Sequence, residues 1–271
     1  MGALSSALDR ATRACLGASI AQQRRLHGGD LSDVYHLTLR DGRQVVAKHG
    51  PLVTIEAQML GAIRTAGAPA PEVLGVRTQV MLIEALPETP ATAQSWEALG
   101  DGLRQLHETV GPHYGWDTDY AFGPVTIPNA PKVDWCDFWL ENRLLANPAA
   151  LPNDIVRRLE TLGRRLPDLM PVTPPAALLH GDIWTGNALF TGKRAYLIDP
   201  ACYHGHSEVD LAMLCLFGMP PEAFWSGYGV TDPGLDARRP LYQLWPALVH
   251  LRLFGDSYRA MVDTRLAALG V

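Results

Sequence analysis

Two stretches of the sequence place polar residues that could do chemistry directly after apolar runs. LLHGDIWTGNALF, residues 178–190, contains Asp182 and Asn187, and YLIDP, residues 196–200, contains Asp199. Four residues separate Asp182 from Asn187, the spacing at which a phosphoryl-transfer loop sets a carboxylate near the acceptor hydroxyl and an amide oxygen near a metal. Mg²⁺ prefers oxygen ligands that it shares with phosphates. The pattern predicts a kinase that uses ATP, with Asp182 as catalytic base and Asn187 and Asp199 as Mg²⁺ ligands.

A lysine and a glutamate earlier in the chain fit the same chemistry. Lys48 ends the apolar run VVAK, where an unpaired charge would be costly, and Glu56 follows eight residues later. We predict that the two pair and position the ATP phosphates. The alternative is a solvated lysine at the end of a strand. Gly28 and Gly29 form a flexible turn before this pair and are predicted to contact the nucleotide, although they match neither a G-x-G-x-x-G nor a Walker A pattern.

Two further groups of residues have both a functional and a structural interpretation. Trp184 lies inside the loop of Asp182 and is predicted to flank the acceptor. Asp182 and Asn187 could each merely shape a turn, but their combination with Asp199 disfavours that alternative. His204 and His206 lie near acidic residues and could suggest zinc. We favour a polar loop in which Asp210 caps the following helix.

The first part of the chain predicts a small sheet with helices. Expected are a helix over 3–16, three strands between 24 and 48, a two-residue hairpin turn at Asp41-Gly42, a helix capped by Thr54 and a buried strand at 80–83. Glu84, Ala85 and Leu86 then leave that strand as a connector.

After residue 90 the pattern becomes mainly helical. Apolar stripes run over 96–106 and 155–166, an ordered Gly- and Pro-rich loop or substrate wall lies at 111–135, and residues 210–271 are mostly helical. The polar stretch 178–190 and the run 196–200 predict a loop between two short strands. The fold class is therefore α+β and bilobal, with a small antiparallel-sheet N-lobe over 1–86 and a larger helical C-lobe over 87–271.

Composition excludes several classes of protein. The chain has 271 residues, 47% of them hydrophobic, and a net charge of −5, which argues against a nucleic-acid partner. No apolar run approaches the roughly 20 residues of a membrane span, and the N-terminus has no secretory pattern, so we expect a cytoplasmic protein. The four cysteines match no zinc spacing and are expected to be small buried side chains.

Longer motifs resemble the fructosamine kinase/ketosamine-3-kinase family, within the aminoglycoside phosphotransferase-like kinases of protein-kinase-like fold. The resemblance runs nearly end to end, through GGD at 28–30, YGW at 114–116, DWCDFWLENRL at 134–144, HGDIWTGN at 180–187, IDPACYHGHSEVDLAMLCLFG at 198–218 and LYQLWPALVHLRLFGDSY at 241–258. LFGMPP and the Ile-Trp-Thr of the catalytic loop depart mildly from the family pattern.

The resemblance implies a specific reaction. The family uses ATP and Mg²⁺ to phosphorylate the sugar 3-hydroxyl of ketosamines, as small molecules or on glycated proteins, in protein deglycation repair. It implies that Glu84, Ala85 and Leu86 contact adenine through their backbone, and that Asp210 accepts hydrogen bonds that hold the catalytic loop.

Two alternative functions remain open at this point. One is a kinase for another small hydroxyl compound, such as an aminoglycoside or amino alcohol, and the other is a pseudokinase scaffold that only binds nucleotide. The Trp and Tyr content of 111–143 and 241–258 suits a sugar face more than a polycation, and the complete set of polar residues disfavours a pseudokinase. The sequence leaves the oligomeric state open.

Overall fold

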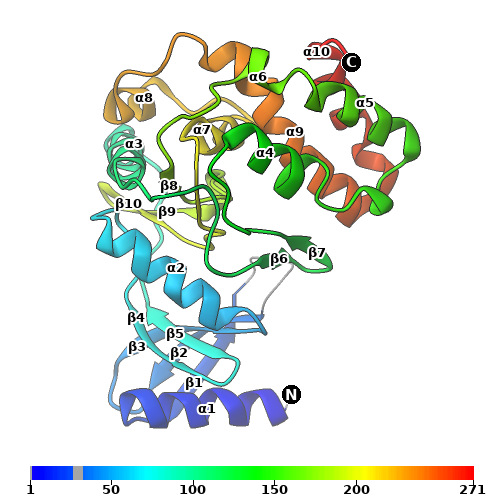
Figure 1. Ribbon diagram of the computed structural model, residues 1–271. Coiled ribbons are helices and arrows are strands. Elements are labelled where there is room, and N and C mark those ends of the chain that lie inside the picture. Colours follow the sequence, from blue (N-terminus) through cyan, green and yellow to red (C-terminus); the bar gives the residue numbers. More distant parts are fainter. Residues whose placement is uncertain (1, 27–32) are drawn as a thin grey trace.

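The N-terminal part is a five-stranded antiparallel sheet with one helix on each face (Figure 1). The computed structural model describes residues 2–26 and 33–271, so Gly28 and Gly29 lie outside the described residues. Strand order is β1-β2-β3-β5-β4. The elements are α1 (Gly2–Leu16), β1 (Ile20–Arg25), β2 (Asp33–Leu39), β3 (Gln44–His49), α2 (Val53–Thr65), β4 (Val73–Arg77) and β5 (Val80–Glu84).

Alternation along β5 explains how both helices pack on this sheet. Val80 and Leu82 belong to the core beneath α1, whereas Met81 belongs to the core that α2 shares with the C-terminal part. Successive side chains of a strand point to opposite faces, so one strand supplies both cores. Lys48 is paired with Met81 in the register of β3 and β5, and this register fixes where the lysine lies.

Three details of the N-terminal part differ from the expectations. The β2–β3 turn contains three residues, because Leu39 N–H donates to the Arg43 carbonyl and Gly42, at φ +88°, donates back to Leu39. Helix α2 begins at Val53 without a side-chain cap, so the Thr54 cap was wrong. Strand β4 was not predicted, since its glycine interrupts the apolar pattern and sits at a register shift.

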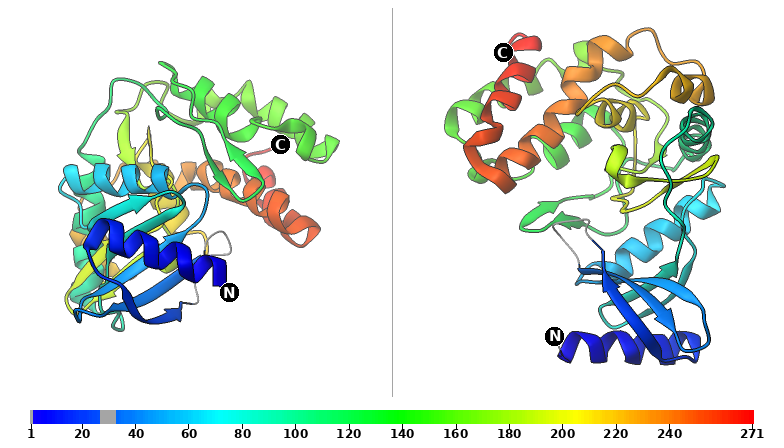
Figure 2. Two further views of the ribbon diagram at one scale, coloured as in Figure 1. Left: turned by 90° about the horizontal axis from the view of Figure 1, so that it is seen from below. Right: turned by 180° about the vertical axis from the view of Figure 1, so that it is seen from behind.

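The C-terminal part is larger and mainly helical, as predicted for an α+β chain (Figures 1 and 2). Its elements are α3 (Ala93–His107), β6 (Tyr120–Phe122), β7 (Val125–Ile127), α4 (Trp135–Trp139), η1 (Leu140–Leu144), η2 (Pro148–Ala150), α5 (Asn153–Gly163), α6 (Leu166–Leu169), β8 (Ala177–Leu179), η3 (Thr185–Asn187), β9 (Ala188–Thr191), β10 (Arg194–Leu197), β11 (Tyr203–Gly205), α7 (Glu208–Leu214), α8 (Glu222–Tyr228), α9 (Leu235–Phe254), η4 (Gly255–Tyr258) and α10 (Arg259–Ala268). The predicted loop over 111–135 contains the β6–β7 hairpin.

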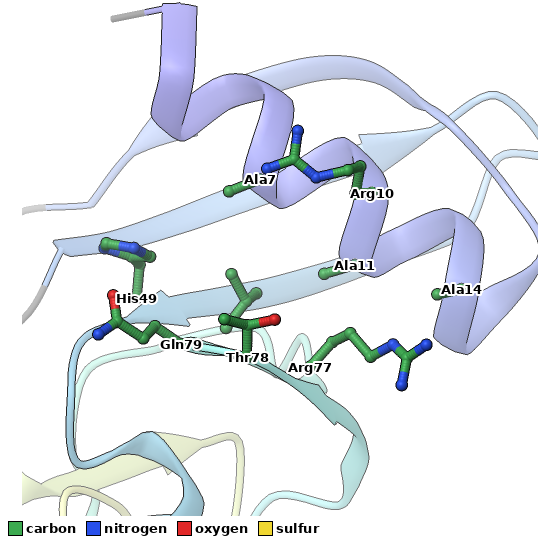
Figure 3. A pocket seen from close by; sticks show the side chains of 9 residues that line it. Ala7, Arg10, Ala11, Ala14, His49, Arg77, Thr78 and Gln79 are labelled. Carbon is green, nitrogen blue, oxygen red and sulfur yellow. The ribbon is translucent and has the colours of Figure 1, made fainter.

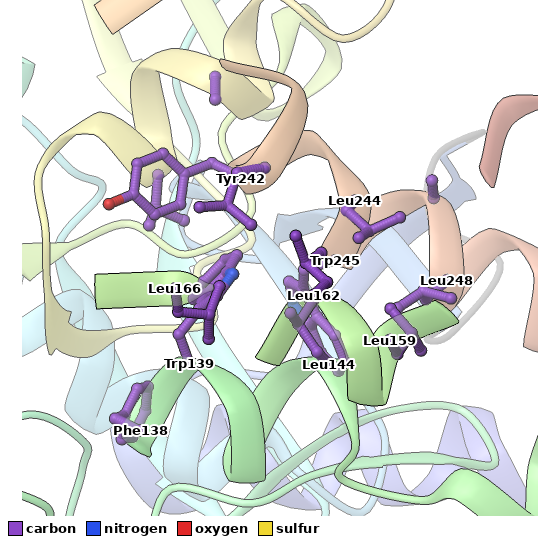
Figure 4. Packing of buried hydrophobic residues seen from close by; sticks show 14 of the residues in the cluster. Phe138, Trp139, Leu144, Leu159, Leu162, Leu166, Tyr242, Leu244, Trp245 and Leu248 are labelled. Carbon is purple, nitrogen blue, oxygen red and sulfur yellow. The ribbon is translucent and has the colours of Figure 1, made fainter. Parts of the chain in front are cut away.

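Two hydrophobic cores organise this part. One packs α4, α5 and α9 around aromatic and leucine side chains, including Phe138, Trp139, Tyr242 and Trp245 (Figure 4). The other is continuous from α2 through α3 to β9 and β10. This second core contains residues from both sides of the predicted boundary at 86/87, so it joins the sheet-bearing part to the catalytic segment.

Helices α3 and α8 approach each other backbone to backbone. A Cβ at Gly100 would lie 2.1 Å from the Phe224 carbonyl oxygen, and one at Gly227 would lie 2.0 Å from the Glu97 carbonyl oxygen. No side chain fits such gaps, so both positions require glycine. The N-terminus of α3 is fixed by a capping box in which Thr92 and Ser95 satisfy each other's backbone N–H.

A pocket lies on the outer face of the sheet rather than at the catalytic segments. It is lined by α1, by His49 and by the β4–β5 turn, with Arg10 and Arg77 at its rim (Figure 3). Helix α1 covers the face of the sheet that is turned away from the C-terminal part (Figure 1). This pocket therefore belongs to a different surface from Asp182.

The sequence analysis made one prediction about membrane spans and one about cysteine burial, and Cys15 departs from the second. Among residues 2–26 and 33–271, no helix has both the length and the apolarity needed to cross a bilayer. The cysteines are unpaired: Cys15 is half-buried, and Cys136, Cys202 and Cys215 are buried.

Candidate active site

The segment 180–187 forms a tight loop between β8 and β9. It can turn after His180 because Gly181 has φ +80°, and a Cβ there would lie 2.1 Å from the Ala201 carbonyl oxygen. The loop then closes in the short helix η3, which ends at Asn187. This geometry explains why the interval between Asp182 and Asn187 brings the two side chains together.

Asp182 and Asn187 are in direct contact. Asn187 Nδ2 donates to a carboxylate oxygen of Asp182 at 3.0 Å and to the Asp182 backbone carbonyl at 2.7 Å. Burial raises the pKa of Asp182 to about 8, with further upward contributions from Asp199 and Asp210, while the Asn187 bond opposes the shift. A carboxylate with a raised pKa is a stronger base than an ordinary aspartate, which suits proton abstraction from a hydroxyl.

Asp199 meets the lysine–glutamate pair from the N-terminal part. Lys48 Nζ donates to Glu56 at 2.7 Å and to Asp199 at 2.9 Å, across 151 positions of sequence. Burial disfavours the charge on Lys48, but the two carboxylates outweigh it and raise the lysine pKa. Burial also raises the pKa of Glu56 to about 7, against the pull of Lys48. The expected Lys48–Glu56 pair is therefore present, and Asp199 completes a three-membered ion cluster.

Backbone strain marks Asp199. Its φ of +55° lies in the left-handed region, which residues with a Cβ seldom occupy. Such strain persists where the surroundings hold the residue, often at functional sites. Here the ion pair with Lys48 holds the carboxylate of Asp199 beside β3.

The oxygen atoms of Asn187 and Asp199 are suitable ligands for a magnesium ion. Asn187 uses its amide nitrogen for both bonds to Asp182, and its amide oxygen is the atom that a hard cation would take. Asp199 supplies carboxylate oxygen from a side chain that is only partly buried. Oxygen donors from one amide and one carboxylate, completed by phosphate, match the preference of Mg²⁺. Among the described residues there is no histidine, cysteine and carboxylate cluster of three that would hold another metal.

Asp210 anchors the catalytic loop rather than capping a helix. It accepts hydrogen bonds from the backbone N–H groups of His180 at 2.7 Å and Gly181 at 2.9 Å. The N-cap of α7 is Ser207, so the predicted capping role of Asp210 was wrong. The acceptor role that the family resemblance implied matches this geometry.

His107 extends this anchor and was missed in the sequence. Its Nε2 lies 3.1 Å from Asp210, and its Nδ1 lies 2.9 Å from the Tyr228 hydroxyl. The network thereby ties the loop to α3 and α8. On an apolar helix stripe, a histidine is indistinguishable by sequence from an ordinary core residue; only the contact with Asp210 sets it apart.

Tyr120 is a second residue that the sequence reading did not single out. It lies on β6 and packs against both cores of the C-terminal part. Burial raises its pKa, and the nearby charges of Glu56, Asp199 and Asp182 raise it further. Its phenol group is therefore close to the cluster of acidic residues, and the substrate wall over 111–135 stays a prediction.

The remaining predicted site residues lie in two segments. Glu84 ends β5, and Ala85 and Leu86 follow it, half-buried and outside any helix or strand. Trp184 folds over Gly186, where a Cβ would lie 2.4 Å from the indole, and meets Phe217 edge to face at 5.9 Å. Glycine at 186 therefore allows the indole to lie flat on the catalytic loop.

Comparison with known proteins identifies the family of the chain. The sequence model of the fructosamine kinase family matches residues 4–269. The chain belongs to the fructosamine kinase family. A probable ketoamine kinase of Synechocystis sp. is 34% identical over 273 residues, covering 91% of this chain and 90% of the relative.

Solved structures support the same family and fold. A Thermobifida fusca crystal structure, provisionally named as a fructosamine-3-kinase, superposes with a TM-score of 0.89 at 31% identity and covers 99% of both chains. Aminoglycoside phosphotransferase APH(4)-Ia has a TM-score of 0.67 at 17% identity, covering 98% of this chain and 99% of its own, and shows the shared fold alone. This fructosamine kinase family member has the bilobal protein-kinase-like fold and is a phosphotransferase.

Proposed function

We propose that this chain transfers the γ-phosphoryl group of ATP to the sugar 3-hydroxyl of ketosamines, in repair of glycated amines and proteins. The observation that carries the proposal is the convergence of two contacting pairs, Lys48 with Asp199 and Asn187 with Asp182, close enough that Asp199 and Lys48 both influence the pKa of Asp182. Related proteins are named as ketoamine and fructosamine kinases, which supports a ketosamine as the acceptor.

Each group has a distinct task in this proposal. Asp182 accepts the proton of the acceptor hydroxyl, and Lys48, held by Glu56, binds phosphate oxygen. Asn187 and Asp199 hold Mg²⁺, which neutralises charge on the phosphates when bound. The backbone of Glu84, Ala85 and Leu86 is proposed to contact adenine, and the predicted nucleotide contact of Gly28 and Gly29 lies outside the described residues.

Trp184 is proposed to orient the acceptor. It is two residues from Asp182 and keeps 40% of its surface exposed beside the catalytic loop. Indole provides an apolar face for a sugar ring and attracts an ammonium group, and a ketosamine carries both. The relatives named as ketoamine kinases favour a ketosamine over an aminoglycoside as the acceptor.

A substrate screen tests the proposal directly. Release of ADP is measured with ATP, Mg²⁺ and a panel of fructosamines, ribulosamines, aminoglycosides and amino alcohols, and the position of the phosphate is assigned by NMR. Turnover restricted to ketosamines, with phosphate on O3, is expected. Turnover of aminoglycosides alone would replace the proposed acceptor, and nucleotide binding without turnover of any acceptor would indicate a scaffold.

A further inference from the structure

A strip of aromatic rings continues outward from the catalytic loop. It consists of Trp184, Phe217, His250, Phe254 and Tyr258, and we call it the aromatic strip. Trp184 meets Phe217 at 5.9 Å between ring centroids, and Phe217 meets His250 at 5.6 Å. His250 in turn meets Phe254 at 5.7 Å and Tyr258 at 4.9 Å. The rings come from three separate segments: the catalytic loop, the segment that follows α7, and the C-terminal end of α9 with η4.

The strip is unusually open for an aromatic cluster. Phe217 is 54% exposed and Phe254 is 49% exposed, whereas Phe138 and Phe224 in the cores are fully buried. Contiguous exposed apolar side chains on a soluble protein often mark a binding surface. Folding alone gives no reason to leave these rings in contact with water.

One ring of the strip is held in a fixed orientation. The carbonyl oxygen of Pro246 lies 2.7 Å from His250 Nδ1, and because a carbonyl can only accept, Nδ1 carries the hydrogen. This bond fixes the imidazole plane between Phe217 and the α9–η4 corner. The strip is therefore a preorganised surface, which lowers the entropy lost when a ligand packs on it.

Continuity with the catalytic loop identifies the occupant. If the acceptor hydroxyl lies at Asp182 and the sugar at Trp184, the nitrogen of a ketosamine and its substituent lie further out, where the strip begins. We propose that the aromatic strip binds the nitrogen substituent of the ketosamine and selects substituents with an extended apolar stem, such as a lysine side chain. This inference rests on the proposed function.

The open end of the strip sets no limit on substituent length. Phe254 lies at the end of α9 and remains half exposed, so a stem that crosses the strip emerges into solvent. A lysine side chain has four methylene groups, long enough to pack on several rings before its peptide backbone begins. The strip therefore accommodates a ketosamine on a peptide as well as a free one.

A matched substrate series tests the strip. The same ketose is attached to methylamine, hexylamine and the side chain of Nα-acetyl-lysine, and kcat/KM is measured for each. The ratio of the hexyl to the methyl compound should be about tenfold or more in the wild type, since each buried methylene strengthens binding. Phe254→Ala and Phe217→Ala should reduce that ratio severalfold. Val230→Ala removes a fully exposed valine from the loop after α8 and should leave the ratio unchanged.

The possible outcomes distinguish failure of the aromatic-strip inference from failure of the proposed ketosamine kinase function. A flat series in the wild type, or a ratio unaffected by Phe254→Ala, overturns the strip while leaving ketosamine phosphorylation intact. No turnover of any ketosamine overturns both. A second copy of the chain could also cover the strip, and analytical ultracentrifugation of wild type and Phe254→Ala tests this. A wild-type dimer that dissociates in the variant would assign the strip to a second copy and overturn the inference.

Discussion

The proposed role of Asp182 as catalytic base rests on burial, which raises the pKa of its carboxyl group, and on Asn187, which donates a hydrogen bond that orients it. Replacing it by the isosteric Asp182→Asn keeps the shape of the loop but removes the proton acceptor. We expect kcat to fall by roughly 10²–10⁴, with little change in the KM for ATP. Steady-state kinetics with both substrates varied measures this, and a kcat near that of the wild type would exclude the role.

Asp199 is expected to decide the response to metal. Asp199→Ala removes the carboxylate that we assign to Mg²⁺ and also frees Lys48 from one partner. We expect Mg²⁺-dependent turnover to be lost, because the protein no longer holds the ion against the phosphates. A titration of rate against Mg²⁺ measures it, with Asp41→Ala in the exposed β2–β3 turn as the matched control. Activity at ordinary Mg²⁺ concentrations in Asp199→Ala would disprove the assignment.

Trp184 has either a substrate role or a packing role, and two constants distinguish them. If the indole binds the acceptor, Trp184→Ala should raise the KM for ketosamine several-fold, in line with a cation–π contact of ~0.5–2 kcal/mol, while the KM for ATP stays nearly unchanged. If it only fills space over Gly186, both KM values and the melting temperature should worsen together. Trp225→Ala, which removes a half-buried tryptophan from α8, is the control.

At the scale of elements, the catalytic segments were the most predictable part. The apolar runs before and after the polar loop indicated β8 and β10 correctly, because burial on both sides of the loop leaves a clear pattern, whereas β9 was not predicted as a separate strand. The β6 and β7 strands were missed, since three-residue strands in a segment rich in Gly and Pro carry no periodicity. The anchoring pair of His107 and Asp210 joins residues 103 positions apart, and no local pattern reports such a contact.

The contact between α3 and α8 makes a matched pair of glycine substitutions informative. Gly100→Ala would drive a methyl group into the Phe224 carbonyl, so we expect a loss of stability of about 2 kcal/mol or more. Gly61→Ala on α2 has open space around the new Cβ and should stabilise the protein by about 0.5–1 kcal/mol, through helix propensity. Urea denaturation of both variants measures the difference. Equal effects would contradict the close backbone packing.

At the scale of the whole molecule, the sequence predicted two lobes and their connector but not the hydrophobic core that the lobes share. The switch from alternating to helical patterns near Glu84 is local, and so it was visible. The core that contains Met59 and Met81 together with Leu103 and Leu197 is not local, because it assembles segments more than a hundred residues apart. The division into two domains at 86/87 therefore stays a prediction, since hydrophobic packing crosses it.

Acid should destabilise the whole fold through His206. Burial, with help from Arg238, lowers the pKa of His206 to about 4, from an ordinary value of 6.5. Glu208 does not reverse this shift, because Arg238 already binds its carboxylate. Between pH 6.5 and about 4 the unfolded chain binds more protons at this position than the folded chain, so stability falls as pH falls.

We expect this histidine to contribute a loss of about 1–3 kcal/mol over that interval. His206→Gln keeps a polar group near Tyr242 but cannot titrate, and it should flatten the dependence of melting temperature on pH between 7 and 4.5. His113→Gln, which replaces a half-buried histidine in the segment before β6, is the comparison. Identical pH profiles for wild type and His206→Gln would show that other groups control the acid response.

The bridge from Lys48 to Asp199 has a consequence for how nucleotide enters. It links β3 to the strained residue after β10, and so joins the N-terminal part to the C-terminal part directly. We expect this link to restrict movement between the two parts, so that less conformational entropy is lost when nucleotide binds. An incoming phosphate meets an ammonium group already aimed at it, but must compete for that group with a carboxylate. We therefore expect nucleotide binding to replace the Asp199 carboxylate with a phosphate as one partner of Lys48, in a site whose two sides are already linked.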